Sequence, residues 1–203
     1  TSLVAVTRNR TDRGQDRRSD VVAATLRVIA RDGLDKASMR AIAQELGCTT
    51  GVLTHYFRDK EQMLDVVLAE LMTAIDDQRG QFHLRDMDVD RYIDYICQLL
   101  PNTEPQVRWW KVWFAFTIAS FVQQKQLSDN HQFYESIRAS WSETFRALMA
   151  NGSIRSDLNP LDEATTLLAV IDGLGVQALI SPDYLTVDRQ RRLLQNHFNR
   201  LRP

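Results

Sequence analysis

Residues 38–64 of the chain read SMRAIAQELGCTTGVLTHYFRDKEQML. Apolar residues recur at helical spacing on both sides of Gly47, which indicates two short helices rather than strands. Ser38 is a favourable N-cap for the first helix, and Gly47 suits the left-handed turn that ends it. We expect the second helix from about Thr50 to Phe57. Two short helices joined by a tight turn are typical of a helix-turn-helix unit.

The second helix of this unit presents a compact polar face without a carboxylate. Its outward positions are Thr49, Thr50, Gly51, Thr54, His55 and Tyr56, and the apolar positions that seal the unit are Ile42, Leu46, Leu53 and Phe57. Short side chains would let the helix approach base edges and phosphates in a DNA major groove. An ordinary three-helix subdomain with one polar face has the same pattern, so the pattern alone leaves both interpretations open.

Helices are also predicted on both sides of this unit. A helix that starts at Arg18 places three apolar residues on one face: Val22, Leu26 and Ile29. Gly33 ends it as a C-cap. On the other side, Asp59 caps a long helix over residues 60–78. Residues 1–17 carry several arginines and no helical period. We expect them to form a flexible basic arm, although a frayed terminus without a role has the same composition.

The rest of the chain also predicts helices. Five are expected, over residues 89–100, 106–124, 130–150, 161–180 and 188–202, with Pro101, Pro105, Pro160 and Pro182 between them. Asn151-Gly152 lies between helical periods, so we interpret it as a helix C-cap and not as a hairpin turn. The 203 residues include only 8 Gly and 5 Pro, too few for the frequent turns of a β-sandwich or barrel. The expected fold class is all-α.

Charge is unevenly distributed along the chain. The net charge is −1, but residues 1–60 hold 11 of the 25 Lys/Arg and 7 of the 26 Asp/Glu. A basic front favours contact of the N-terminal part alone with a polyanion, although an asymmetry of this size also arises by chance.

Other classes of protein find little support in the sequence. The two cysteines lie far apart and the four histidines are scattered, so no disulfide framework, metal site or cofactor is expected. There is no phosphate-binding or dinucleotide-binding motif, and Glu163 and Asp172 are isolated acids. The longest charge-free apolar stretch, residues 112–122, is too short to span a membrane, and no signal peptide is evident. We expect a cytoplasmic protein that is not an enzyme.

The stretch 38–64 closely resembles the DNA-binding domain of the TetR family of transcriptional regulators. The resemblance covers about residues 18–65 and rests on Ile42-Ala43, Leu46-Gly47, Gly51, Tyr56-Phe57, Lys60-Glu61 and Leu64. It implies a DNA-binding domain over residues 18–65. Two positions depart from the pattern: Thr54 stands where many relatives carry Tyr, and Cys48 where Val is usual. We interpret Cys48 as a small core residue.

The resemblance also implies roles for individual residues. Arg40 is expected to reach a base or a phosphate. Three residues are expected to face bases: Thr50, Gly51 and Thr54. Four are expected to contact phosphates and so fix the register on the DNA: Thr49, His55, Tyr56 and Lys60.

Residues 66–203 are expected to form an effector-binding and dimerisation domain. Residues 109–116, 138–141 and 167–179 resemble the BetI-like subgroup of the family, which responds to choline-type compounds. The helix over 161–180 is apolar nearly all round, so it must be buried on more than one side. We expect a homodimer through 161–180 and 188–202, with Leu193, Leu194, Phe198 and Leu201 on the second helix. A central core helix would show the same pattern.

An aromatic cluster is the candidate effector pocket. Its members are Trp110, Trp113, Phe114, Trp141 and Phe145. Aromatic faces can hold a quaternary ammonium, but an aromatic stripe at helical spacing is equally consistent with an ordinary core.

Taken together, these patterns predict a homodimeric regulator that binds a palindromic operator. The resemblance implies a repressor released by an unknown small-molecule effector, with the helix over 60–78 as the element that spans both regions. The alternative is a DNA-binding protein with no small-molecule effector.

Overall fold

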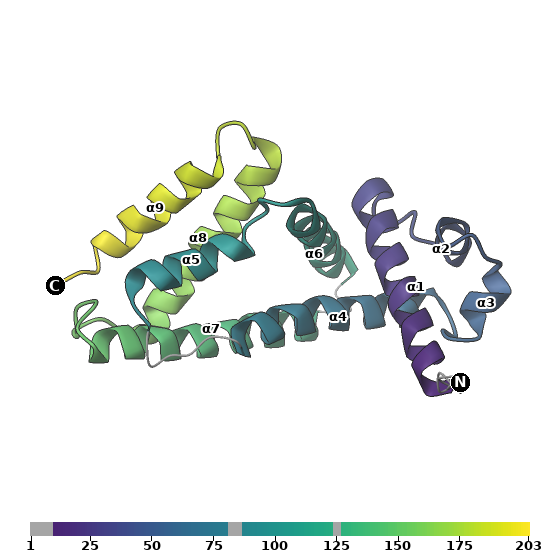
Figure 1. Ribbon diagram of the computed structural model, residues 1–203, viewed down its shortest axis with the longest axis horizontal. Coiled ribbons are helices and arrows are strands. Elements are labelled where there is room, and N and C mark those ends of the chain that lie inside the picture. The colour runs from purple at the N-terminus through teal and green to yellow at the C-terminus, as the bar shows by residue number, and fades with distance from the viewer. Residues whose placement is uncertain (1–9, 81–86, 124–126) are drawn as a thin grey trace, which may run out of the picture. The chain divides into compact units, whose positions relative to one another are not determined.

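The computed structural model describes residues 10–80, 87–123 and 127–203. These residues form helices and connecting turns, and the predicted all-α class is confirmed. The elements are α1 (Arg10–Asp32), α2 (Met39–Glu45), α3 (Thr50–Thr54), α4 (Lys60–Gly80), α5 (Val89–Leu99), α6 (Glu104–Gln123), α7 (Leu127–Ala150), α8 (Pro160–Ile180) and α9 (Val187–Asn199), as labelled in Figure 1.

The helices divide into two compact units. The first unit contains α1, α2, α3, α4 as far as Ala74, and residues 111–116 of α6. The second contains the rest of α4 and α6 together with α5, α7, α8 and α9. The sequence pattern predicts only the helix over 60–78 as an element shared between regions. In the structure, α6 is a second shared helix.

The first unit begins earlier than the sequence pattern predicts. Helix α1 starts at Arg10, so residues 10–17, expected in the basic arm, are helical. Residues 1–9 lie outside the described residues. The core face of α1 is fully buried at Val21, Ala24 and Val28. Gly33 ends the helix with φ +89° and donates its N–H to the carbonyl of Ile29 at 2.9 Å, as a helix C-cap requires.

The turn between α2 and α3 has the predicted chemistry. The hydroxyl of Ser38 accepts the N–H of Ala41 at 3.2 Å, which caps α2. Gly47 has φ +65°, and the N–H of Cys48 then donates to the carbonyl of Ala43 at 2.9 Å. Cys48 is half-buried with a free thiol. Helix α3 ends at Thr54 rather than at Phe57, and His55 is its C-cap.

The second unit is built around an aromatic core. Helix α7 packs on α8, and α5 packs on α9. The ring of Tyr92 on α5 meets Phe145 of α7 edge-on at 6.0 Å and Phe198 of α9 at 5.7 Å. Phe145 and Phe198 are stacked at 5.9 Å. Gly152 follows α7 with φ +77°, and its N–H donates to the carbonyl of Met149, which confirms the C-cap at Asn151-Gly152.

One correction concerns α9. Leu194, Phe198 and Leu201 were expected to face a second subunit, but they are buried within their own chain at 0%, 0% and 8% exposure. The reason is that α9 lies on α5, and this inward face needs the same apolar spacing as a dimer interface. Leu193, at 41% exposure, is the exposed member of the predicted set.

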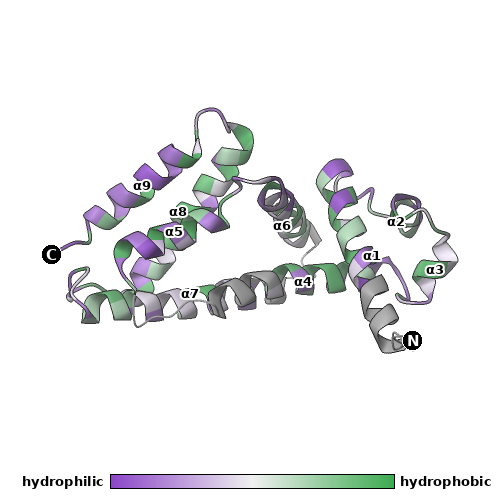
Figure 2. Ribbon diagram, viewed as in Figure 1, coloured by the Kyte–Doolittle hydropathy of each residue, from purple (hydrophilic) through white to green (hydrophobic). Residues whose placement is uncertain are grey.

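Helix α8 is apolar on more than its buried side. Figure 2 shows much of α8 in green, whereas most of α9 is purple. In the described part of the chain, α8 is the helix long and apolar enough to cross a membrane by length and composition, a test that core helices of soluble proteins also pass. Its inward residues include Leu167, Ile171 and Leu174, whereas Val176 and Ile180 are exposed at 36% and 75%.

Candidate DNA-binding surface and effector site

Helix α3 carries an exposed polar surface held in place by two buried residues. Leu53 and Phe57 are 0% and 1% exposed and fix the helix and the turn after it. Six of the eight predicted DNA-binding residues are exposed: Arg40, Thr49, Thr50, Gly51, Thr54 and His55. Tyr56 and Lys60 are half-buried. The structure therefore places residues 49–55 on α3 and its two caps, with Tyr56 directly after them, and leaves most of these residues accessible.

Two details of α3 concern what this surface can recognise. The hydroxyl of Thr54 donates to the carbonyl of Gly51 at 3.1 Å, whereas the side chain of Thr49 makes no cap hydrogen bond. A Cβ atom built on Gly51 would meet Thr49 Oγ1 at 3.7 Å as its nearest neighbour, which is an ordinary contact. The protein itself therefore has room for a side chain at position 51.

Lys60, at the start of α4, is tied to the loop between α1 and α2. Its ammonium nitrogen lies 3.4 Å from the carbonyl oxygen of Leu34 and 3.5 Å from that of Asp35. A lysine ammonium has three donors, so these two long contacts leave capacity for a further acceptor such as a phosphate. Lys60 thus has a structural contact that its sequence position does not reveal.

The N-terminus of α4 is capped reciprocally. Asp59 Oδ1 accepts the N–H of Gln62 at 2.8 Å, and Gln62 Oε1 accepts the N–H of Arg58 at 2.7 Å. The hydrogen bond from Gln62, followed by that from Arg58, lowers the pKa of Asp59. Arg58 is exposed and pairs with Asp59 at 2.8 Å, which places a further guanidinium, absent from the predicted set, directly after α3.

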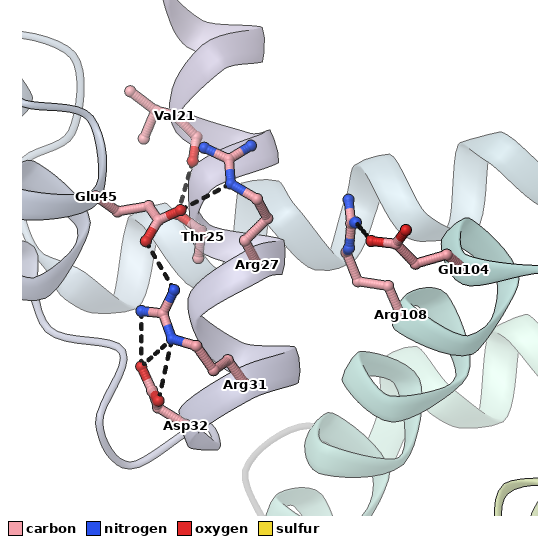
Figure 3. A network of polar contacts seen from close by, with 8 residues as sticks. All are labelled: Val21, Thr25, Arg27, Arg31, Asp32, Glu45, Glu104 and Arg108. Carbon is pink, nitrogen blue, oxygen red and sulfur yellow. Dashed lines mark hydrogen bonds and ion pairs between the residues drawn. The ribbon is translucent and has the colours of Figure 1, made fainter.

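Figure 3 shows an ion-pair network that joins α1 to α2. Glu45 accepts the Nε–H of Arg27 at 2.8 Å and an Nη1–H of Arg31 at 2.9 Å. These hydrogen bonds, Arg27 first, lower the pKa of Glu45. The sequence signal for this network is an acid at the last residue of α2, a place where the helix dipole disfavours negative charge.

The predicted aromatic pocket is not one cluster within one unit. Trp113 and Phe114 belong to the first unit, and Trp110, Trp141 and Phe145 to the second. All are buried at 3% exposure or less except Phe114, which is half-buried. The indole of Trp110 donates to the carbonyl of Leu99 at 2.7 Å, so its polar atom already has a partner.

Trp141 differs from Trp110 in its hydrogen bonding. It is 3% exposed, and its indole N–H has no hydrogen-bond partner among the residues that the structure describes. Tyr92 meets its ring edge-on at 6.4 Å. Buried N–H groups are nearly always paired, so Trp141 is an unusual donor in the core of the second unit. Tyr92, which meets both Trp141 and Phe145, and Phe198, which stacks on Phe145, were not in the predicted pocket, since apolar spacing does not show which helices meet.

Among the described carboxyl groups of the second unit, Asp172 is the one whose pKa is raised to about 6. It lies half-buried on α8, where its carboxylate accepts the hydroxyl of Tyr134 on α7 at 3.0 Å. Burial raises the pKa of Asp172 to about 6, and the Tyr134 hydrogen bond opposes that shift. Asp172, an isolated acid in the sequence, therefore has a partner across the α7–α8 contact.

A groove of about 460 Å³ runs between α8 and α9. Its lining includes Ala169, Gly173 and Gln177 from α8 and Leu193, Asn196, His197 and Arg200 from α9. None of the five predicted pocket residues lines it. Among the described residues, no group of three His, Cys, Asp or Glu could hold a metal ion.

Two family models match the chain. One, for the N-terminal region of bacterial regulatory proteins of the tetR family, matches residues 21–67, and the other, for the C-terminal region of BetI-type transcriptional repressors, matches residues 89–203. The second match alone spans more than half of the chain. The chain belongs to the TetR family. The resemblance of residues 18–65 is thereby confirmed, as is that of the second domain to the BetI type.

This TetR-family regulator has similar relatives along nearly its whole length. It is 27% identical over 184 residues to the HTH-type transcriptional regulator PksA of Bacillus subtilis, covering 90% of this chain and 88% of that protein. It is 26% identical over 191 residues to BetI of Ectopseudomonas mendocina, covering 90% and 92%. All are transcriptional regulators, which supports the expectation that the chain is not an enzyme.

Solved structures share the fold of this TetR-family regulator. A transcriptional regulator from Rhodococcus sp. matches with a TM-score of 0.76 at 24% identity, covering 91% of this chain and 95% of that one. A regulator from Saccharomonospora viridis, solved in complex with choline, matches with a TM-score of 0.73 at 26% identity, covering 91% and 96%.

Proposed function

We propose that this TetR-family protein is a ligand-responsive repressor that binds a palindromic operator as a homodimer in the cytoplasm and is released by a small-molecule effector. The observation that carries the proposal is the exposed, carboxylate-free surface of residues 49–56, positioned by buried Leu53 and Phe57. The second short helix of a helix-turn-helix unit reads the major groove.

In this proposal the eight residues have different tasks. Thr50, Gly51 and Thr54 face base edges. Arg40 reaches a base or a phosphate. The phosphate contacts are Thr49, His55, Tyr56 and Lys60, and they set the register without reading the sequence. In a twofold dimer the two α3 helices would meet half-sites about 34 Å apart, one turn of DNA, or a multiple of it.

The dimer forms through the exposed faces of α8 and α9. Apolar side chains are exposed at Val176 and Ile180 on α8 and at Leu193 on α9. Two further side chains are exposed nearby along the chain: Tyr184, at 66%, in the connection between the helices, and Val187, at 51%, at the start of α9. Apart from its chain neighbours and the backbone of α8, no described residue has an atom within 4 Å of a Cβ built on Gly173, so a second α8 can approach closely there. An apolar surface of this kind marks an interaction site.

The effector is proposed to be a small organic cation. The regulator from Saccharomonospora viridis was solved with choline, and this chain has a half-buried carboxylate on Asp172 in its second unit. Aromatic faces attract quaternary ammonium groups. Of the five predicted pocket residues, Trp110, Trp141 and Phe145 belong to this unit, as does Tyr92, whereas Trp113 and Phe114 belong to the first unit.

An electrophoretic mobility shift on the promoter beside the gene tests the DNA-binding part. We expect a shifted complex that is lost when Thr50 and Tyr56 are both replaced by Ala, since the double variant loses a base contact, worth about 1–3 kcal/mol, and a phosphate contact that fixes the register. The matched control is Thr103→Ala, an exposed threonine of the second unit that lies outside α8 and α9. Unchanged binding by the double variant would assign recognition to another surface.

Addition of choline to the complex tests the effector part. We expect choline to release the DNA and to raise the Tm of the free protein. A protein that binds the promoter but gives no change with choline or other quaternary amines supports the alternative, a DNA-binding protein with no small-molecule effector.

A further inference from the structure

His197 on α9 has a ring nitrogen that the folded chain leaves unsatisfied. The side chain is half-buried, and its Nε2 atom is buried with no hydrogen-bond partner in the part of the chain that the structure describes. The ring meets that of Phe198 edge-on at 5.4 Å. Buried polar atoms of side chains are nearly always paired, so this nitrogen marks a place where one copy of the chain does not complete a polar site.

His197 lines the groove of about 460 Å³ between α8 and α9. Gly173 and Leu193, which lie on the surface proposed for the dimer, line the same groove. Arg200 lies in it as well, and apart from His197 and Arg200 the described residues that line it are uncharged. A second copy that packs on α8 and α9 therefore covers His197 and Arg200 together.

The acids on the helices around α9 are engaged elsewhere. On α5, which packs on α9, Asp94 pairs with Arg191. On α8, Asp172 accepts the hydroxyl of Tyr134 of α7. Helix α5 also carries other titratable side chains, which do not act on the pKa of His197: Asp90, Arg91, Tyr92, Tyr95 and Cys97.

The folded chain favours the neutral form of His197. Burial, followed by the charge of Arg200, lowers the pKa of His197. The ring lies in the last turn of α9, where the helix dipole favours a cation, so burial and the neighbouring charge outweigh that preference. A second copy over the groove would remove further water from the ring, which disfavours the charged form again.

Symmetry supplies the groove with more positive charge and not with an acid. In a twofold interface the same patch lies on both subunits and faces its own copy. The two patches bring two His197 and two Arg200 side chains to one interface and, from the described residues that line the groove, no carboxylate. Charges that lose water without an opposite charge are costly.

We propose that His197 makes the dimer sensitive to acid. Protonation of its imidazole adds a cation beside Arg200 in the groove that the second copy covers, so the dimer dissociates. This inference rests on the proposed function, because it needs a dimer through α8 and α9. Dissociation would release the operator, since the two half-sites are then no longer bound by one molecule.

The direction of the pH dependence follows from linkage. The dimer holds His197 at a lower pKa than the separate chains do, so dissociation takes up as much as one proton for each subunit. The dimer is therefore at full strength above pH 6.5, the ordinary pKa of histidine, and it weakens as the pH falls below that value.

Sedimentation velocity at a series of protein concentrations measures the Kd of the dimer without DNA, so that titration of His55 on the DNA-binding surface does not enter. We expect the Kd to rise about tenfold or more between about pH 7.5 and about pH 5.5, within the limit of two protons for each dimer. The same profiles separate a folded monomer from an unfolded chain, which sediments more slowly for its mass.

His197→Gln keeps a polar side chain that does not titrate, so its Kd should be the same at both pH values. The matched control is His131→Gln on α7, an exposed histidine whose loss should leave the wild-type pH dependence in place. Arg200→Gln removes one of the two like charges and should reduce the rise in Kd. If His197→Gln is monomeric at about pH 7.5, Arg200→Gln decides, and a rise as large as that of the wild type contradicts the inference.

A mobility shift on the promoter extends the test to DNA. The wild-type complex should be lost at about pH 5.5 and the His197→Gln complex should persist, and because His55 is present in both proteins the difference belongs to His197. Equal loss of the two complexes would contradict a release through His197.

Three results would overturn the inference while leaving the dimer in place. The first is a Kd that does not change with pH, and the second is an equal rise in His197→Gln. The third is a Kd that falls in acid, which would show that a carboxylate of the second copy, such as the exposed Asp183 or Asp188, pairs with the imidazolium. A wild-type protein that is monomeric at every pH would remove the proposed dimer, and the inference with it.

Discussion

Two glycines in α8 show how a single missing side chain can serve different purposes. Gly175 is buried, and a Cβ built there would lie 2.2 Å from the ring of Trp110, whose indole is fixed to Leu99. A Cβ built on Gly173 would meet no described residue within 4 Å apart from its chain neighbours and the backbone of α8. Both glycines lie in the same helix, and the structure assigns Gly175 to its buried side.

Replacing these glycines by alanine gives opposite predictions. Gly175→Ala should lower the free energy of unfolding by about 2 kcal/mol, because the anchored indole has little room to move. Gly173→Ala is the matched control when both variants are compared in a monomeric background, where no second α8 approaches, and there it should leave the free energy of unfolding unchanged or higher. Thermal unfolding at a fixed protein concentration measures both, and equal losses would show that Trp110 does not fill the space over Gly175.

Asp172 makes stability depend on pH in a predictable direction. Its pKa is raised from 3.8 to about 6, so the folded state holds the proton more tightly than the unfolded state. Stability is therefore highest below pH 3.8 for this group and falls as the pH rises to about 6. Asp172→Asn should remove this slope and raise stability at pH 7 by about 2–3 kcal/mol at most.

The measurement is denaturant unfolding at several pH values. Asp183→Asn is the control, since Asp183 is exposed in the turn after α8. A slope between pH 4 and 6 that persists in Asp172→Asn would assign the titration to another group.

At the scale of the element, α2 is held by charge as well as by apolar contact. It has seven residues, too few to be stable as an isolated helix. Ile42 and Ala43 bury one side, and Glu45 joins its last residue to Arg27 and Arg31 of α1. Because α3 follows directly after the turn, the placement of α2 determines where the recognition surface lies.

Glu45→Gln should lower the Tm by a few degrees at pH 7 and weaken DNA binding. The pKa of Glu45 lies below 4.5 in the folded state, so its contribution is present above that pH. It is lost as the pH falls through the folded pKa, and the two proteins should then converge. The control is Glu104→Gln, which breaks the 2.8 Å pair with Arg108 within α6. Equal effects of the two changes would contradict a special role for Glu45.

Element boundaries show what sequence patterns can and cannot determine. The caps at Ser38, Asp59 and Gly33 follow from local chemistry, and the helices after residue 87 match their predicted bounds within a few residues. The end of α3 was placed too late because Phe57, four residues after Leu53, fits a continuing helix as well as a turn that packs inward. The hydrogen bond between Thr54 and Gly51 depends on a rotamer, which no spacing reveals.

At the scale of the whole molecule, the sequence predicts that α8 and α9 have apolar faces that must be buried. It does not predict whether the same chain or a second copy buries them. Leu194 and Phe198 on α9 have the spacing of an interface and are core residues of their own chain. Apolar periodicity is the same whether the covering surface comes from the same chain or from a second copy. The exposure of each side chain in the folded chain separates the two cases. Ile180 and Leu193 are exposed and are therefore the candidates for contact with a second copy.

Ile180→Glu combined with Leu193→Glu should convert the dimer to a monomer. The mass measured by light scattering should fall from about twice 23.4 kDa to about 23.4 kDa, because charges would be buried without partners. Ile118→Glu on α6 is the control, an equally drastic change at a residue 60% exposed. A wild-type protein that is monomeric at micromolar concentration would contradict the proposed dimer.

Helix α6 contains three of the four tryptophans within five residues, and they fall on both sides of the division between the units. Trp109 and Trp110 belong to the second unit and Trp113 to the first. In Trp141→Phe, all indole emission would come from this one helical turn and a half. Effector binding and DNA release could then be followed by intrinsic fluorescence, on an otherwise unlabelled protein and in real time.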